Sequence, residues 1–127
     1  MIDCTLDSTA LVDLTRGYRA LAPISMRFRQ AAISHVALGE VLFGASKASN
    51  PRETDKIAKL LVGLTLLHGD EKTAIIYAQI RYSLERRGEV IPHNDLWIAA
   101  ASIQADVPLV TRDNHFTRVP GLTIATY

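Results

Sequence analysis

Residues 2 to 14 of the chain read IDCTLDSTALVDL, and the hydrophobic pattern of this segment changes at Asp7. Before Asp7 the apolar residues form a short run of the kind that makes a buried strand. After Asp7 a helix is indicated by apolar residues that share one face, namely Ala10, Leu11 and Leu14. Asp7 or Ser8 can cap this helix and Gly17 can end it. The segment therefore predicts a strand over residues 2–6 followed directly by a helix.

The same alternation of strand and helix continues along the chain. Further strands are predicted at 31–34, 64–68, 108–111 and 122–125, and helices at 35–47, 51–61, 70–87 and 94–105, with weaker helical spacing over 21–29. Asn94 is expected to cap the last of these helices. Strands that alternate with helices indicate an α/β domain with a central, mostly parallel sheet.

Length and composition limit the class of protein. The 127 residues suit one domain with a single core, which we expect to span 1–127. With 14 Lys and Arg against 13 Asp and Glu, the net charge attracts no polyanion over the whole surface, so a nucleic-acid site has to be local. No apolar run is long enough to span a bilayer, so no membrane partner is expected. The lone Cys4 is expected to pack in the core of a cytoplasmic protein, because it has no disulfide partner.

Four acidic residues fall where strands of such a sheet end. Asp7 closes the first strand, and Asp113 comes two residues after Thr111, where a later strand ends. Glu40 lies in the helix after the second strand, and Asp95 lies in the first turn of its helix. Because ligands of parallel sheets bind beyond the carboxyl ends of the strands, we expect these carboxylates to meet there.

Four carboxylates in one place need a cation. Two like charges ~4 Å apart repel by about 4 kcal/mol at an effective dielectric constant of ~20. An all-oxygen ligand set without a Cys or His cluster favours a hard metal such as Mg²⁺ or Mn²⁺. Such a metal lowers the pKa of a bound water and stabilises charge that grows on a phosphoryl group. The pattern thus indicates a site for a hard metal with coordination positions left open for a phosphate.

Several longer motifs follow one another in a specific order and spacing. They are LDST at 6–9, GEVLFG at 39–44, YAQIR at 77–81, NDLWIAA at 94–100, LVTRD at 109–113 and VPGL at 119–122. Together they resemble the PIN-domain ribonucleases, and within them the VapC-type toxins of toxin-antitoxin pairs, over nearly the whole chain. The resemblance implies a PIN-like three-layer α/β/α sandwich, a homodimer, endonuclease activity on RNA, and a cognate VapB-type antitoxin that blocks the site.

The resemblance also assigns roles to the four acids. It implies that Asp7, Glu40, Asp95 and Asp113 are the catalytic, metal-binding residues. Asp7 and Asp95 are expected as principal ligands, with Glu40 as a ligand or as the group that orients the attacking water. Asp113 is then an outer ligand or serves a second metal, and the number of metals stays open. At position 9 the family commonly has Asn where this chain has Thr9, which affects the hydrogen bonding expected around the metal.

Each of these acids also has an ordinary interpretation. Asp7 and Asp95 suit helix starts, Asp113 suits a turn, and Glu40 could lie on a solvated helix face. Other acids are expected to be structural or solvated: Asp3, Asp13, Asp55 and Asp70. The histidines are expected to be surface or packing residues, because none shares ligand spacing with another on one helix face: His35, His68, His93 and His115.

Two other classes of function are compatible with parts of the pattern. The first is a catalytically silent PIN-like module that binds RNA or a partner protein, against which the presence of all four acids argues. The second is a phosphotransfer domain, either a phosphatase or a receiver. The phosphatase would need Asp in place of Thr9, and the receiver would need a Lys after the strand at 108–111.

Overall fold

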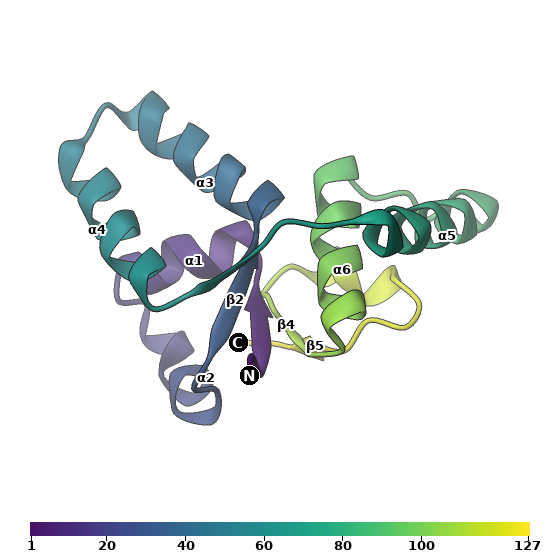
Figure 1. Cartoon of the computed structure of the whole chain (residues 1–127), viewed down its shortest axis with the longest axis horizontal. Coiled ribbons are helices and arrows are strands. Elements are labelled where there is room, and N and C mark those ends of the chain that lie inside the picture. The colour runs from purple at the N-terminus through teal and green to yellow at the C-terminus, as the bar shows by residue number, and fades with distance from the viewer.

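The computed structural model describes residues 1–127, and a single sheet runs through the middle of the molecule (Figure 1). The sheet has the strand order β3-β2-β1-β4-β5, and every pairing in it is parallel. The strands are β1 (Cys4–Leu6), β2 (Ala31–Ser34), β3 (Thr65–Leu67), β4 (Leu109–Val110) and β5 (Ile124–Ala125). The expectation of a mostly parallel sheet is confirmed, and the sheet is parallel throughout.

Helices cover both sides of this sheet. They are α1 (Ser8–Thr15), α2 (Ala22–Arg27), α3 (His35–Ala48), α4 (Pro51–Val62), α5 (Glu71–Arg87) and α6 (His93–Ala105), with short 3-10 segments η1 (Arg19–Leu21) and η2 (Asn114–Arg118). In Figure 1 helices α1 to α4 lie to one side of the strands, and α5 and α6 lie to the other. This gives the three-layer α/β/α sandwich that the resemblance implied. None of the helices combines the length and hydropathy needed to cross a bilayer.

The core lies between these layers. Because helices cover both faces of a parallel sheet, its central strands are mostly apolar, and the side chains of β1 and β4 are all buried. The buried apolar side chains form one cluster of 22 residues drawn from nearly all the elements. Cys4 belongs to this cluster, and burial raises the pKa of its thiol to about 12. The expected packing role of Cys4 is therefore confirmed.

The strand order creates a point where the chain changes direction across the sheet. From β1 the chain builds outward through β2 to β3, and it later returns to place β4 on the other edge of β1. At the carboxyl end of this pair, the backbone N–H of Asp7 donates to the carbonyl of Val110 at 3.3 Å. In open α/β sheets the ligand crevice lies at such a point, and here Asp7 stands beside it.

The structure shows which residues begin the two helices α1 and α6. Helix α1 is capped by Asp7 and not by Ser8, because an Asp7 oxygen accepts the N–H of Ala10. The expectation that Asn94 caps α6 is wrong: the helix already begins at His93, after Pro92, and no side chain caps it. Both Ser8 and Asn94 are thereby free to bind other groups.

Candidate active site

Asp7 lies at the end of β1 and begins α1, and its carboxylate is almost fully enclosed. The residue is 4% exposed. One carboxylate oxygen accepts the N–H of Ala10 at 2.7 Å, and the other accepts the hydroxyl of Thr111 at 2.5 Å. Burial raises the pKa of Asp7, and the charges of Asp95 and Asp113 raise it further, while the two hydrogen bonds act in the opposite direction. The orientation of the Asp7 carboxylate is therefore fixed, and no positively charged side chain lowers its pKa.

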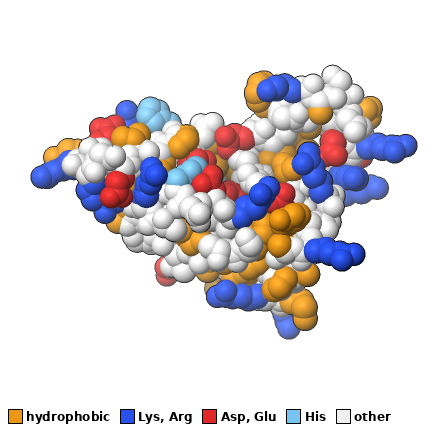
Figure 2. Space-filling model, turned by 180° about the vertical axis from the view of Figure 1, so that it is seen from behind, with side chains coloured by type: hydrophobic (Ala, Val, Ile, Leu, Met, Phe, Trp, Pro, Cys, Tyr) orange, Lys and Arg blue, Asp and Glu red, His pale blue; other side chains and the backbone are white.

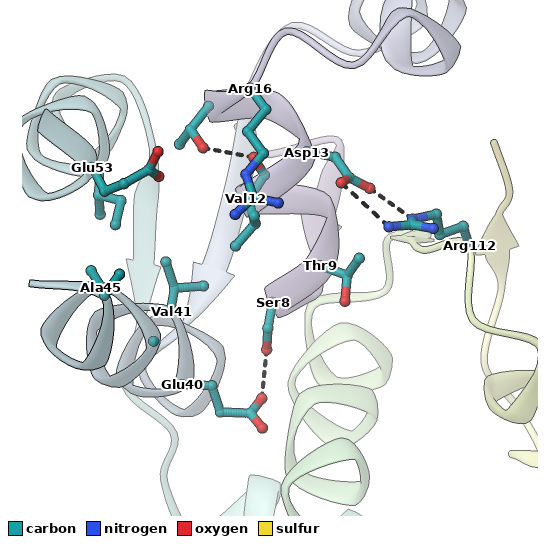
Figure 3. Close-up of a pocket in the computed structure, with 14 residues that line it drawn as sticks. Ser8, Thr9, Val12, Asp13, Arg16, Glu40, Val41, Ala45, Glu53 and Arg112 are labelled. Atoms are coloured by element: carbon teal, nitrogen blue, oxygen red, sulfur yellow. Dashed lines mark hydrogen bonds and ion pairs between the residues drawn. The ribbon is translucent and has the colours of Figure 1, made fainter. Parts of the chain in front are cut away.

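Glu40 lies on α3 and faces the start of α1 (Figure 3). Its Oε1 accepts the hydroxyl of Ser8 at 2.5 Å, and its Oε2 accepts the side-chain amide of Asn94 at 3.4 Å. Ser8 and Asn94, which do not cap their helices, thus hold the Glu40 carboxylate between α1 and α6. A solvated helix face, the ordinary interpretation of Glu40, does not account for these contacts.

Asp95 lies in the first turn of α6 with a side chain that is 18% exposed. Burial is the largest cause of its raised pKa, His115 lowers the pKa, and the charges of Glu40 and Asp113 raise it. The nearby acids thus act on Asp95 in the same direction as burial.

His115 joins Asp95 to Asp113. Its Nε2 lies 2.6 Å from an Asp95 oxygen and its Nδ1 lies 2.8 Å from an Asp113 oxygen. The contact of the buried Nε2 lacks the alignment of a hydrogen bond. The interpretation of His115 as an ordinary surface or packing residue is therefore wrong. The turn-forming Asp113 indicated only a local turn, in which it accepts the backbone N–H of His115 at 3.1 Å, and no sequence pattern indicated the contact with Asp95.

The structure brings each of the four predicted acids within electrostatic range of at least one other. Asp7 is influenced by Asp95 and Asp113, and Asp95 is influenced by Glu40 and Asp113. However, no three Asp, Glu, His or Cys side chains form a closed cluster that could by itself enclose a metal ion. The donor set fits a hard divalent cation that keeps several of its waters, because all four groups are carboxylates whose repulsion a cation would relieve.

A second buried carboxylate lies beside these acids. Asp13, on α1, is 5% exposed and accepts the Arg112 Nε–H at 2.8 Å and the hydroxyl of Tyr127 at 2.7 Å (Figure 3). Hydrogen bonding to Asp13 raises the pKa of Arg112. Asp13 is structural, as expected, but it is buried and not solvated.

Glu40 and Asp13 border a cleft between α1, α3 and α4, while Asp7, Asp95 and Asp113 are not part of its lining. The cleft has a volume of about 330 Å³, and its polar lining includes Ser8, Thr9, Arg16, Glu40 and Arg112. Figure 2 shows acidic side chains gathered in a hollow between two lobes of the molecule, with Lys and Arg side chains near it. The hollow therefore combines a carboxylate centre with local positive charge.

The family model described as PIN domain matches residues 4–122. The chain is a PIN-domain protein. Among curated relatives, Ribonuclease VapC2 of Rickettsia felis is 32% identical over 98 residues, which are 76% of this chain and 73% of that protein. Ribonuclease VapC2 of Haemophilus influenzae is 30% identical over 128 residues, or 96% of each chain. This PIN domain thus belongs to the VapC ribonucleases, which makes it a nuclease of the hydrolase class and removes the phosphotransfer alternatives.

Solved structures agree with this assignment. The PIN domain matches a chain in the structure of VapBC2 from Rickettsia felis bound to a DNA fragment from the promoter, with a TM-score of 0.88 and 26% identity over 99% of each chain. It matches a chain of DNA-bound VapBC from Salmonella typhimurium with a TM-score of 0.81 and 25% identity over 99% of this chain and 98% of the other. The fold is therefore shared over the full length.

Proposed function

We propose that this PIN-domain protein is a metal-dependent endoribonuclease that hydrolyses RNA phosphodiester bonds as the toxin of a toxin-antitoxin pair. The observation that carries the proposal is the convergence of four carboxylates beyond the ends of β1 and β4, where each of them influences another. The curated relatives named ribonucleases support the choice of RNA as substrate.

The proposed metal is Mg²⁺, with Mn²⁺ as an alternative, and Asp7 and Asp95 would hold it with Glu40 and Asp113 beside them. When bound, the cation supplies an acidified water and neutralises charge on the phosphoryl oxygens. The chain itself supplies orientation. Ala10 and Thr111 fix the Asp7 carboxylate. Ser8 and Asn94 hold Glu40 where it can orient a water for in-line attack, and the products are expected to carry 5′-phosphate and 3′-hydroxyl ends.

The proposed protein partner is a cognate VapB-type antitoxin that covers the site, in a cytoplasmic complex. Structures of similar chains are described as VapBC complexes, two of them bound to DNA. From the family resemblance we also propose a homodimer. Size-exclusion chromatography with light scattering tests this, and a purified protein that has the mass of one chain at all concentrations contradicts it.

The central test is incubation of the purified protein with RNA in Mg²⁺, in Mn²⁺ and in chelator, alongside Asp7→Asn and Asp95→Asn. Cleavage is expected only for the wild-type protein with metal. Cleavage that persists in chelator, or in both variants, overturns the mechanism. Binding of RNA without cleavage in any divalent metal would instead identify the silent PIN-like module.

A further inference from the structure

We propose that Arg112 is the phosphate-binding cation of the substrate cleft, and that the buried Asp13 and Tyr127 are positioning residues that hold its guanidinium in place. The inference rests on the proposed function, because its ligand is a phosphate of the RNA backbone next to the cleavage site. None of these three residues belongs to the set of acids assigned above.

Asp13 fixes one edge of the guanidinium. Its two oxygens accept the Arg112 Nε–H at 2.8 Å and an Nη2–H at 3.5 Å, and Tyr127 donates its hydroxyl to the same carboxylate at 2.7 Å. A guanidinium has five N–H donors in a rigid plane. The hydrogen bonds to Asp13 take the Nε–H and one Nη2–H, so N–H groups on the other edge of the oriented Arg112 guanidinium remain for a further acceptor.

Aromatic side chains support the same arrangement. The Arg112 Cζ lies 5.6 Å from the centroid of the Tyr18 ring, and the rings of Tyr18 and Tyr127 meet edge to face at 6.2 Å. Gly17, with φ of +65°, turns the chain after α1 so that the backbone N–H of Tyr18 donates to the carbonyl of Asp13 at 3.0 Å. Segments distant in sequence thus cooperate to orient one exposed cation.

Stability alone gives little reason to bury Asp13. The Arg112 side chain is 48% exposed, and ion pairs open to solvent contribute only about 0–1 kcal/mol. Enclosing a carboxylate costs desolvation free energy that such a pair repays poorly. The ion pair with Asp13 instead fixes the direction of the Arg112 guanidinium while leaving it exposed to solvent.

The position of Arg112 fits an anion next to the acids. It stands between Thr111, which donates to Asp7, and Asp113, and it lines the cleft together with Ser8, Thr9 and Glu40. A polyanion that approaches four carboxylates needs a nearby cation, and the net charge of +1 supplies no general attraction. Arginine suits this task because it binds phosphate oxygens bidentately. Arg16 also lines the cleft, but no side chain fixes its guanidinium.

The test measures binding of a labelled single-stranded RNA in chelator at several salt concentrations, and KM for cleavage in Mg²⁺. Each phosphate contact contributes a slope of about −0.7 to log K against log salt for single strands. Arg112→Gln is expected to flatten the slope by about this amount and to raise KM about tenfold or more, as for a lost charged hydrogen bond. Arg112→Lys is expected to restore the slope, and Asp13→Asn to raise KM with the slope retained.

Two controls keep the result interpretable. The double variant Asp13→Asn with Arg112→Gln leaves no unpaired buried charge, so it stays folded if the single variant does not, and it is expected to show the same flattened slope. Arg81→Gln removes another exposed arginine that pairs with a carboxylate, Glu85 at 3.0 Å, and is expected to change neither quantity. Unchanged slope and KM in Arg112→Gln and in the double variant overturn the inference. Wild-type protein that cuts no RNA overturns the proposed function instead.

Discussion

At the scale of single residues, Asp7 has two opposing effects on the stability of the fold. As a cap it stabilises the start of α1, and as a nearly enclosed carboxylate beside two other acids it is destabilised in its ionised form. Perturbed groups of this kind concentrate at functional sites, where stability is lost in exchange for activity. The conflict can be measured, because the two effects respond differently to substitution.

We expect Asp7→Asn to be inactive and yet to melt at a higher temperature than the wild type when metal is absent. Asn keeps the acceptor for Ala10 and removes the charge. Because the folded-state pKa of Asp7 is raised, its ionisation makes folding less favourable as pH rises from the ordinary carboxyl value of 3.8 through the raised value. The advantage of the variant should therefore be largest at neutral pH and shrink as pH falls toward 3.8.

Melting curves in chelator at a series of pH values check this prediction. A variant that melts below the wild type at every pH would show that the carboxylate contributes more as a hydrogen-bond acceptor than its burial costs.

Cys4 offers a second test of burial at the residue scale. Burial raises its pKa from 9.0 to about 12, so at pH 8 the folded protein holds roughly a thousandfold less thiolate than the unfolded chain. The folded state loses stability as pH rises between these two values, since it binds the thiol proton more tightly. Labelling with a thiol reagent at pH 8 should be slow in buffer and fast in guanidinium. Equal rates would place Cys4 outside the core.

At the scale of elements, the register of α3 determines where Glu40 points. Ser34 ends β2 and caps α3 by accepting the N–H of Ala37 at 3.1 Å. The capping contact therefore fixes the first turn of the helix that carries the Glu40 carboxylate toward Ser8. Loss of this capping hydrogen bond should therefore affect both the free energy of unfolding and the position of Glu40.

We expect Ser34→Ala to lower the free energy of unfolding by about 1 kcal/mol, the usual cost of a lost cap. Urea denaturation measures the change. Ser46→Ala is the matched control, because Ser46 lies on the same helix but its exposed hydroxyl only donates to the carbonyl of Leu42. Equal effects of the two substitutions would contradict a capping role for Ser34.

The helices and strands also show which parts of the fold can be predicted from sequence patterns. Apolar periodicity and turn residues predicted every strand and α-helix, because these signals are local. Strands β4 and β5 are two residues long where four were expected, since pairing with the neighbouring strand, and not the apolar run, determines where a strand ends. The segment η2 was not predicted, because its path depends on the buried Phe116 and on contacts far away in sequence.

The same distinction applies to the candidate site. That the four acids lie at one end of the sheet could be predicted from their positions relative to strand ends and from parallel topology; their roles stay a prediction. The contacts of His115 could not, because they depend on how η2 folds back toward α6. The pairing of Asp13 with Arg112 joins residues 99 positions apart and carries no local pattern.

At the scale of the whole molecule, the core and the site meet at Phe116. This ring is 1% exposed in the central cluster, and the His115 ring lies 4.8 Å from it. We expect Phe116→Ala to cost about 3–5 kcal/mol of stability through the cavity it leaves. That is a large part of the total for a small domain.

Urea denaturation with RNA cleavage on the same samples tests this prediction. Val90→Ala is a suitable control, since Val90 is 56% exposed and its truncation should change stability little. A Phe116→Ala protein as stable as the control would mean that η2 docks without its aromatic anchor.

The strand order has a consequence for synthesis on the ribosome. The central strand β1 is made well before its partner β4, and Asp7 reaches its hydrogen-bond donor Thr111 only after the chain between them has been made. At about 5–20 residues per second, the intervening chain takes roughly 5–20 s to translate. A nascent or prematurely terminated polypeptide that stops before Thr111 therefore carries no assembled carboxylate centre, so the cell that makes this chain meets its chemistry only after β4 has been translated.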